Sequence, residues 1–551
     1  MLKPLAAVVA AAVVVWPACA RAPESPAAIL ADAATCHGAP APSQPGDPAR
    51  APGLLEGLGV AGFAPEGARD EAARYFEQGV RLFHSFNAPE AIRALRWAQI
   101  ADPACAMCAW GEAWVRGPTI NYPVDAKAAG LAHDALVRAQ RLGAGLSPKS
   151  QALIAALAQR YPVRGGAARV DDAAYARAME ALAARFPDDG AVVTEAADAL
   201  LIASGQAWAE PGAIRASPQV RRAREMLERV LARSPGYTPA IHFDIHLMEW
   251  SGEPARAVAA ADRLGGLAPA AGHLVHMPSH LYFRLGRYED AATSNARAVA
   301  ADRAHVAALR PPGGLPSFAL HAHNVSFGLA GALMSGDGPG ALAFARAARA
   351  SFGQDTGLGP RAWLAEARFG GPDEVLRAPR PGPAYAQALW RYARGEALAR
   401  RGDAAGVAAE AREIGALKLP DRAGRSDRAV VEVARLTLEG RAALLAHRPA
   451  DAVAAFRKAA DLRDAVDTIP DPPIWPLPPR RSLGAALVLA GDLPAARAEL
   501  AKSLARDRED PLALFALSEA QRRAGAESRT AAVAAKRGWK GDPAAFRLEL
   551  I

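Results

Sequence analysis

The sequence is short of the residues that build β-proteins and disulfide-rich proteins. Only 6% of its 551 residues are aromatic, and four are cysteines. Aromatic and β-branched residues favour strands, so their scarcity argues against a large β-sandwich or barrel. A chain of this length buries a core without disulfide staples. No apolar run of about 20 residues follows the N-terminal region, which excludes a polytopic membrane protein.

Charge of one sign is not concentrated anywhere in the chain. Lys and Arg number 65 against 57 Asp and Glu, which leaves a net charge of +8. There is no Lys/Arg block, and aromatic residues do not interleave with basic ones as they do in a nucleic-acid-binding surface. We therefore expect a solvated, Arg-rich surface and no nucleic-acid partner.

The first 20 residues have the pattern of a secretory signal peptide. Lys3 supplies a positive start, residues 5–16 are apolar, and the A-x-A sequence at 18–20 is a cleavage site. The apolar stretch is too short to span a bilayer, so no transmembrane segment is expected in the mature chain. A lipoprotein modified at Cys19 is less favoured, because WPA at 16–18 fits the usual preceding triplet poorly. We expect an exported protein, periplasmic or secreted.

Cleavage after residue 20 leaves three cysteines in an oxidising compartment. Cys105 and Cys108 form a C-x-x-C pair, without the His that follows in haem attachment and without a second pair for zinc. We expect one disulfide, from Cys36 to Cys105 or Cys108; a redox or metal role for the pair is the alternative. Residues 21–66 are rich in Pro, Ala and Gly and are expected to form a loosely packed N-terminal arm.

What the sequence has in abundance is Ala, Leu, Arg and Glu, which are strong helix formers, arranged with an internal period. Identical residues recur 34 positions apart, as in Pro235 and Pro269, Ala257 and Ala291, and Gly252 and Gly286. Small residues let the two helices of a unit approach closely, and larger apolar residues fill the seam. This is the period of the tetratricopeptide repeat, or TPR. The expected fold class is all-α, a right-handed α-solenoid of TPR helix-turn-helix repeats.

The repeats set the expected domain organisation. Units are expected near 70–103, 106–145, 171–202, 221–269, 270–303, 318–352, 384–414, 428–462, 478–508 and 511–540. Pro- and Gly-rich stretches interrupt the array. We therefore expect an N-terminal TPR array with a His-lined groove over 67–352, an irregular connector over 353–383, and a C-terminal TPR array over 384–551.

Histidines are concentrated in the middle of the array, at matched repeat positions. His242 and His246 are four residues apart, on one helix face, and the positions one repeat later, 276 and 280, are also His. Neighbouring first helices of such units pack about 8–10 Å apart, so imidazoles from both helices can converge on one point. Together with two further histidines, they form the candidate metal ligands: His242, His246, His273, His276, His280 and His323.

Several neutral imidazoles around one point suit zinc, copper or non-haem iron. His273 lies on the same helix face as His276. Alignment of the turn glycines Gly286 and Gly336 places His323 at the repeat position of His273. Asp244 and Glu249 are nearby carboxylates that would ligate the ion or orient the rings. Pro278 is expected to start or kink a helix beside the site, because proline inside a helix clashes with the preceding turn. A hydrogen-bonded groove without metal is the alternative.

Five segments of the chain resemble a family of exported bacterial TPR proteins of undefined function. They are AGHLVHMPSHLYFRLGRYEDAATSNARAVAAD from Ala271, IHFDIHLMEWSGEPARAVAAADRL from Ile241, HAHNVSF from His321, FNAPEAIRALRWAQIADPACAMCAWGEAW from Phe86 and PPRRSLGAALVLAGDLPAA from Pro478. The resemblance covers about residues 66–530, and AGHLVHMPSH is its most specific motif. It implies the solenoid, export and a His-lined feature, but no reaction.

The resemblance also implies residues that support the site. Members look alike at Arg284 and Asn324; they differ in having a second His where Ser326 stands, and Glu-Pro-Pro-x-Trp where DPPIW begins at Asp471. Arg-Phe-Gly-Arg-Trp in relatives is RFGGP at 368–372. Asp471 becomes a distant partner of the site if the solenoid curls. The residues expected to line or support the groove are Asp244, Glu249, Arg284, His321, Asn324 and Asp471.

Three classes of function stay open at this point. The first is an exported metal-binding protein or metalloenzyme that uses the histidines. The second is a periplasmic scaffold whose groove binds peptides or protein partners without metal. The third is an enzyme with His acid/base groups and no metal. The sequence identifies no catalytic residue and no substrate.

Overall fold

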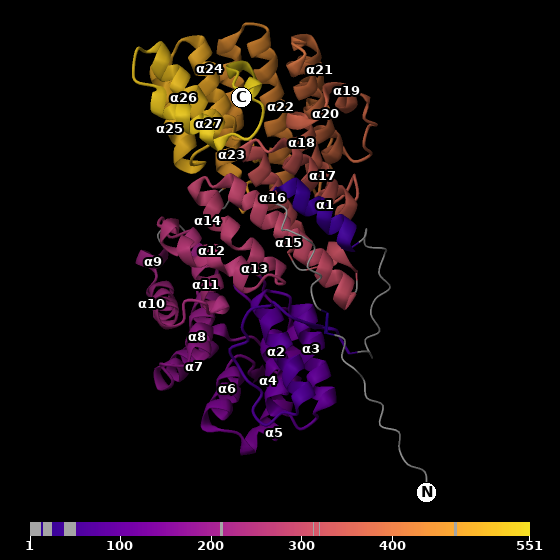
Figure 1. The fold of residues 1–551 in the computed structure, drawn as a ribbon, viewed down its shortest axis with the longest axis vertical. Helices are drawn as coiled ribbons and strands as arrows, with labels where there is room; N and C mark the ends of the chain where they lie inside the picture. The colour runs from indigo at the N-terminus through magenta and orange to yellow at the C-terminus, as the bar shows by residue number, and fades with distance from the viewer. Residues whose placement is uncertain are drawn as a thin grey trace. The chain divides into compact units, whose positions relative to one another are not determined.

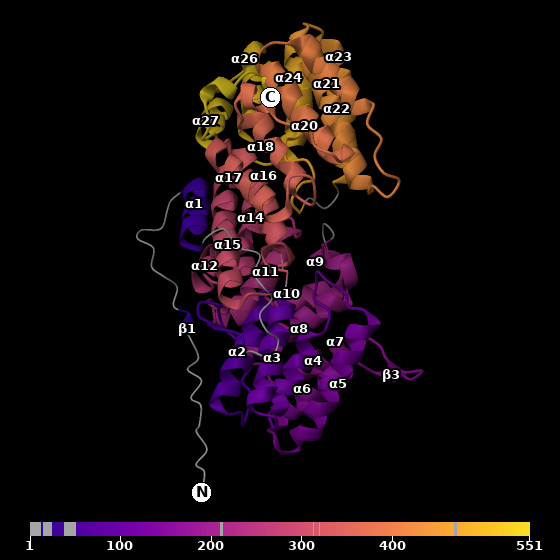
Figure 2. The ribbon, with the colours of Figure 1, turned by 90° about the vertical axis from the view of Figure 1, so that its right-hand side faces the viewer.

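The chain divides into two compact units, which are described separately. The computed structural model describes residues 13–14, 25–37, 51–209, 213–311, 313–318, 320–467 and 471–551. Unit 1 comprises residues 1–21, 37–281 and 301–320, and unit 2 comprises residues 22–36, 282–300 and 321–551. The predicted signal peptide lies outside the described residues, apart from Val13–Val14. Figures 1 and 2 show that the described chain consists mainly of helices joined by loops.

Unit 1 is a series of helices in which each packs against its neighbours in sequence. The helices are α2 (Asp70–His84), α3 (Ala88–Ala101), α4 (Ala106–Val115), α5 (Ala126–Leu142), α6 (Pro148–Ala158), α7 (Asp172–Arg185), α8 (Gly190–Ala203), α9 (Ala213–Ala216), α10 (Pro218–Arg233), α11 (Thr238–Glu249), α12 (Val258–Leu267) and α13 (Gly272–His276). Short 3-10 turns lie at η1 (Gly143–Gly145), η2 (Gly205–Ala209), η3 (Pro254–Ala257) and η4 (Leu315–Ser317). Two minimal strand pairs complete the unit: β1 (Val13–Val14) runs parallel to β2 (Leu54–Leu55), and β3 (Val163–Arg164) runs antiparallel to β4 (Ala167–Ala168).

Unit 2 follows the same pattern of neighbouring helices. Its helices are α1 (Pro26–His37), α16 (His321–Ser335), α17 (Gly338–Phe352), α18 (Ala362–Phe369), α19 (Pro372–Arg377), α20 (Ala384–Arg400), α21 (Ala404–Gly415), α22 (Arg425–Leu445), α23 (Pro449–Val466), α24 (Pro479–Ala490), α25 (Leu493–Arg506), α26 (Pro511–Arg523) and α27 (Arg529–Gly538). The 3-10 turns are η5 (Gly359–Arg361), η6 (Pro543–Ala545) and η7 (Leu548–Leu550). Two helices, α14 (Pro278–Leu285) and α15 (Tyr288–Leu309), contribute residues to both units.

Glycines at the repeat positions explain how the helices of a pair come close. A Cβ atom on Gly79 of α2 would lie 2.6 Å from Cγ of Leu95 on α3. A Cβ on Gly440 of α22 would lie 2.7 Å from the ring of Phe456 on α23. Only a residue without a side chain permits this approach. The same device therefore builds pairs in both units, and the predicted all-α solenoid of TPR-type repeats is confirmed.

Two segments expected to be irregular contain helices. Residues 353–383, predicted to be an irregular connector, include η5, α18 and α19, because Trp363 and Leu364 give α18 an apolar face that is buried in the core of unit 2. Within the predicted arm at 21–66, residues 26–37 form α1, in which Ile29 and Leu30 are buried. Proline and glycine frequency marked helix ends here rather than unstructured chain.

The disulfide differs from the one predicted. Cys105 bonds to Cys108, with a Cα–Cα distance of 5.3 Å, so a bond from Cys36 to either residue is wrong. Cys105 caps the N-terminus of α4 and its sulfur accepts a hydrogen bond from the backbone N–H of Cys108. A residue at the N-cap and one three positions later lie beside each other in the first helical turn, which brings the two sulfurs together. The Cys36 side chain lies outside the described atoms.

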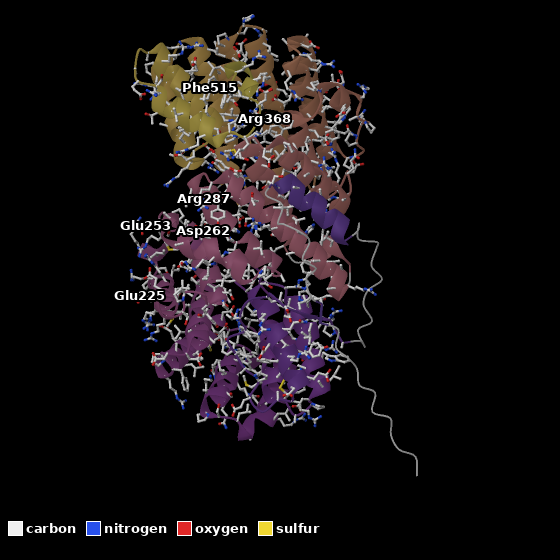
Figure 3. All side chains as sticks on the ribbon, in the orientation of Figure 1. Glu225, Glu253, Asp262, Arg287, Arg368 and Phe515 are labelled. Atoms are coloured by element: carbon white, nitrogen blue, oxygen red, sulfur yellow. A yellow bond between two sulfur atoms is a disulfide. The ribbon has the colours of Figure 1, made fainter. Side chains whose placement is uncertain are left out.

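Charged side chains cover the outer helices, as the composition predicts. Figure 3 shows Glu225 on α10 and Glu253 beside η3 at the outer edge of unit 1, and both side chains are more than half exposed. Within the described part of the chain, no helix is both long and apolar enough to cross a bilayer.

Candidate metal centre

Helix α11 carries the first two histidines into the interior of unit 1. It begins at Thr238, with Pro239 in the first turn, where the missing N–H costs nothing. Every residue from Thr238 to Glu249 is buried. A helix that is buried on all sides packs even its polar face against protein. His242 and His246 therefore lie side by side on one face, away from water.

A break in the next helix brings three more histidines to the same place. Helix α13 ends at His276 and α14 begins at Pro278, so Met277 is the one residue between the two helices. The break predicted at this proline is confirmed. His273 and His276 lie before the break and His280 after it, and the backbone N–H of His280 donates to the carbonyl of Met277. The break between α13 and α14 therefore lies between His276 and His280.

Three imidazole nitrogens converge between these helices. Nε2 of His242 lies 2.9 Å from Nε2 of His273 and 3.1 Å from Nε2 of His246. A neutral imidazole nitrogen carries either one hydrogen or one in-plane lone pair, so Nε2 of His242 satisfies one neighbour only. One ligand atom from each of these residues lies within 4.8 Å of the others. A cation between them would satisfy all three nitrogens at once.

A second pair of imidazoles is oriented by a carboxylate. Nε2 of His276 lies 2.8 Å from Nε2 of His280. Nδ1 of His280 lies 2.9 Å from Oε2 of Glu249, and Nδ1 of His276 lies 3.3 Å from Oγ of Ser279. When Nδ1 of His280 donates to Glu249, its Nε2 presents a lone pair. The two Nε2 atoms thus face each other, while the Nδ1 atoms contact Ser279 and Glu249.

The two groups adjoin, and together they form what we call the five-histidine cluster: His242, His246, His273, His276 and His280. The ring centroids of His246 and His280 are 5.8 Å apart, as are those of His273 and His276. None of the five is more than 5% exposed. Five buried imidazoles in ring-to-ring contact bring several nitrogen donors of one kind together, which is the type of donor set that a transition-metal ion binds.

Two aromatic side chains that the sequence did not single out, Phe86 and Trp208, pack against the cluster. The ring of Phe86 stacks on His246 and His273 and lies 4.6 Å from His242. Phe86 occupies the turn between α2 and α3 at φ 56°, a conformation that bulky residues rarely adopt. Trp208 of η2 packs edge-on to His246. A phenylalanine at a turn position that usually takes small or polar residues was the available signal.

Burial favours the neutral form of an imidazole. It lowers the pKa of His242 to about 3, with His84 and His280 adding to the effect and the His84 carbonyl opposing it. Burial also lowers the pKa of His84 to about 4. His84 is 4% exposed, and its Nε2 has no hydrogen-bond partner among the described residues. Neutral imidazoles bind metal without first losing a proton.

The remaining predicted site residues lie in other surroundings. Asp244 is buried on α11, but the charges that act on it come from Glu228, Arg224 and Arg256, so it faces α10 rather than the histidines; burial raises its pKa to about 6. Glu249, in contrast, contacts His280 directly.

The other candidates belong to unit 2. Nε2 of His323 lies 3.5 Å from Oδ1 of Asp471, so these two predicted residues meet in a partly exposed pair. His321 is fully buried and bonds through Nε2 to the hydroxyl of Ser351 at 3.1 Å. Asn324 is also fully buried on α16, and Arg284 lies on α14.

The solved structures that are similar to this chain include three distant matches. No family model matches the chain, and no curated protein matches it. Similar structures include "Naa15/Naa10 bound to HypK-THB" (14% identity, 84% of this chain and 62% of that chain, TM-score 0.23), yeast Tom70 (12%, 85% and 92%, 0.27) and the P58(IPK) TPR domain (11%, 76% and 98%, 0.20). The chain spans less than two thirds of the first of these. Overlaps this weak carry no argument about function.

Proposed function

We propose that this chain is an exported TPR-type solenoid protein that binds a transition-metal ion in unit 1, through His242, His246 and His273. The observation that carries the proposal is the meeting of three buried Nε2 atoms at 2.9 and 3.1 Å along two of their three separations. Two nitrogens bound to one zinc ion at 2.0–2.1 Å in tetrahedral geometry lie about 3.3 Å apart. Along these two separations the nitrogens therefore need to move apart by only a few tenths of an ångström.

The donor chemistry selects the class of metal. Imidazole nitrogens suit zinc, copper and iron, whereas calcium and magnesium take oxygen ligands. His276 and His280 form a second position, in which Glu249 fixes the tautomer of His280. Three imidazoles leave one coordination position open, and a metal bound in that way supplies Lewis acidity and an activated water. The proposal extends to metal binding and names no substrate.

Export is part of the proposal and is supported independently of the histidines. The leader-like residues 1–20 and the Cys105–Cys108 disulfide both suit an oxidising compartment. N-terminal sequencing of the protein from a fractionated Gram-negative host tests it. We expect a periplasmic chain that begins at Arg21. A cytoplasmic chain that retains residues 1–20 would contradict export.

Metal binding is tested on the full mature chain, purified without a metal-affinity tag and stripped with a chelator. We expect the wild type to take up about one equivalent of zinc or more, as measured by calorimetry and elemental analysis. The double variant His242→Ala/His273→Ala should lose the three-histidine position. His447→Asn is the matched control, because His447 is exposed and sits at φ 56°, which asparagine tolerates.

The same experiment separates the alternatives. Uptake below about a tenth of an equivalent in the folded wild type would leave a TPR scaffold without metal, or an acid/base enzyme, as the account of these histidines. A protein or peptide partner for the array stays a prediction in either case. Capture of a partner by both the wild type and the double variant would place that interaction away from the cluster.

A further inference from the structure

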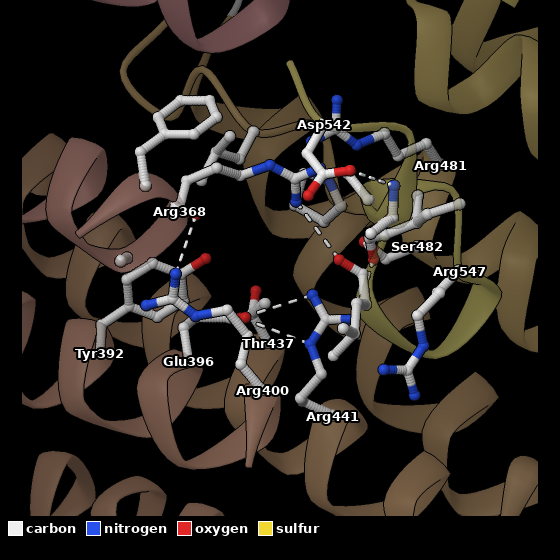
Figure 4. A pocket seen from close by; sticks show the side chains of 18 of the residues that line it. Arg368, Tyr392, Glu396, Arg400, Thr437, Arg441, Arg481, Ser482, Asp542 and Arg547 are labelled. Carbon is white, nitrogen blue, oxygen red and sulfur yellow. Dashed lines mark hydrogen bonds and ion pairs between the residues drawn. The ribbon is translucent and has the colours of Figure 1, made fainter. Parts of the chain in front are cut away.

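A cavity in unit 2, remote in sequence from the histidines, is lined by arginines. It has a volume of about 450 Å³ and is bounded by α18, α20, α22, the start of α24 and the C-terminal turns η6 and η7. Figure 4 shows the guanidinium groups around it. This volume lies in the range of sites for small organic molecules.

Positive charge predominates on the wall of the cavity. The five basic side chains are Arg368, Arg400, Arg441, Arg481 and Arg547, and the acidic ones are Glu396 and Asp542. Asp510 also pairs with Arg481 at 3.1 Å, and Glu549 lies 3.9 Å from Arg547, whereas Arg368 and Arg400 form no ion pair with a described residue. Arginine stays charged in proteins, so this excess is not removed by proton loss at neutral pH.

Burial increases the electrostatic free energy of these positive charges. Burial, with Arg481 and Arg441 nearby, lowers the pKa of Arg368 to about 9. Arg441 is committed to Glu396 at 3.4 Å and to backbone oxygens of Glu549 and Ile551. An anion in the cavity would lower the repulsion among the remaining cations.

Several donors that face the cavity have no partner among the residues described. They are Nε and Nη2 of Arg400, Nε of Arg481 and the hydroxyl of Thr437. Thr437 is 5% exposed and Arg481 is 2% exposed, so bulk water does not serve them. Buried polar atoms in native proteins are almost always paired. These atoms belong to three different helices, which indicates a shared missing partner rather than one misplaced side chain.

In a second cavity of unit 2, carboxylates balance the positive charges of the basic residues. This cavity has a volume of about 560 Å³ and is also rich in basic residues. There, however, Arg480 pairs with Asp464 at 2.6 Å and also with Glu499, and Arg463 pairs with Asp507 at 2.8 Å. The carboxylates nearly match the cations, and no ligand is needed to balance them. In the cavity at Arg400, by contrast, Arg368 and Arg400 donate to backbone carbonyls rather than to carboxylates.

The rest of the wall is apolar and aromatic. Phe369, Tyr392, Leu477 and Trp539 line it, and the guanidinium of Arg368 stacks over Trp539 at 5.3 Å. Such a wall accepts a hydrocarbon or aromatic group, while the guanidinium groups pair with an oxyanion.

We propose that this cavity binds a small organic anion, with its carboxylate or phosphate head on Arg400, Arg481 and Thr437, and its apolar part against Phe369 and Trp539. The site lies entirely in unit 2 and is independent of metal binding. Carboxylate and phosphate each present two oxygens that can accept a pair of parallel N–H bonds from one guanidinium group. The two are distinguished by separate probes.

Calorimetric titration of the full chain tests the proposal. The probes are phenylacetate and phenyl phosphate, with benzyl alcohol as the neutral control of similar size. We expect at least one anion to bind at least about tenfold more tightly than benzyl alcohol, because a hydrogen bond to a charged group is stronger than one to a neutral group. The tighter of the two anions identifies the head group.

Two variants locate the binding. Arg400→Gln should weaken the anion at least about tenfold. Thr437→Val, which keeps the shape and removes an unpaired hydroxyl, should weaken it by a smaller factor without loss of stability. Arg448→Gln is the control, because Arg448 is exposed and lies outside the cavity. Neither anion binding better than benzyl alcohol, or unchanged affinity in both variants, overturns the proposal.

Discussion

The two units bury polar side chains in opposite ways. Unit 1 gathers five buried histidines, and burial lowers the pKa of one of them, His242, to about 3. Unit 2 gathers arginines, which remain charged after burial and repel one another. A neutral imidazole offers a lone pair and attracts a cation, whereas a guanidinium offers hydrogens and attracts an anion. The two proposals therefore assign ligands of opposite charge to similar helical repeats.

The largest expected effect tests whether the two sites are separate. His242→Ala/His273→Ala should weaken metal binding more than about a hundredfold, because two of three ligands are lost. The same variant should bind phenyl phosphate or phenylacetate as the wild type does. Arg400→Gln should show the converse result in the same two titrations. Loss of both metal binding and anion binding in either variant, with the fold intact by circular dichroism, would show that the two sites are not separate.

The next effect concerns Glu249, which contacts Nδ1 of His280. Glu249→Gln keeps the size of the side chain but removes the charge that fixes the imidazole tautomer. We expect metal affinity to fall about 10–100-fold, the usual cost of such a partner, measured by competition with a chelator of known affinity. Glu253→Gln, an exposed residue in the following turn, should leave affinity unchanged. If the Glu249→Gln variant binds metal as tightly as the wild type, Glu249 contributes to packing and not to metal affinity.

A third prediction uses Glu195 and Asp198, two buried acids of unit 1. Glu195 accepts hydrogen bonds from Trp114 and Tyr175, yet burial raises its pKa to about 7, and burial raises the pKa of Asp198 well above its usual range. The folded state therefore holds more protons than the unfolded state between about pH 4.5 and pH 7. Stability should fall by about 1–3 kcal/mol across that interval as pH rises.

Urea unfolding at several pH values measures this fall. Asp198→Asn should flatten it and stabilise unit 1 at high pH, because the amide cannot ionise. Asp188→Asn is the control, since Asp188 is exposed and paired with Arg233. A stability that rises between pH 5 and pH 7 in the wild type, or an unchanged slope in Asp198→Asn, would contradict the assignment.

The smallest effect tests whether the repeats in both units share one packing rule. Gly440→Ala should destabilise the protein by about 1–3 kcal/mol, because the new methyl overlaps the Phe456 ring. Gly130→Ala, in the open interior of α5, meets nothing within 4 Å and should stabilise by about 0.5–1 kcal/mol through helix propensity. Thermal unfolding separates these opposite signs. Equal shifts in the two variants would show that the glycine contacts do not limit the approach of the helices.

The comparison also shows how far the sequence alone reaches. The 34-residue period predicts the helical repeats, and the His242/His246 and His276/His280 matches predict which histidines of unit 1 gather, since both depend on local helical spacing. The His323–Asp471 contact joins residues far apart in sequence, and there the resemblance rather than the spacing was informative. Helices α1, α18 and α19 were missed because Pro and Gly at their ends obscured short apolar faces.

The arginine cavity left no sequence signal, for a related reason. Its residues come from α18, α20, α22, α24 and the last turns of the chain, and each arginine alone resembles a solvated surface residue. Only packing decides which of the many arginines lose their water. Phe86 was likewise missed as a site residue, because its contact with three histidines depends on a long-range approach of the α2–α3 turn to α11 and α13.

X-ray absorption at the metal edge tests the central claim most directly. The full mature chain is stripped, equilibrated with one equivalent of zinc and washed. The account predicts retained zinc with at least three imidazole nitrogens at about 2.0–2.1 Å, and a clear loss of imidazole scattering in His242→Ala/His273→Ala. A spectrum with oxygen ligands only, or the same imidazole count in the double variant, would contradict it.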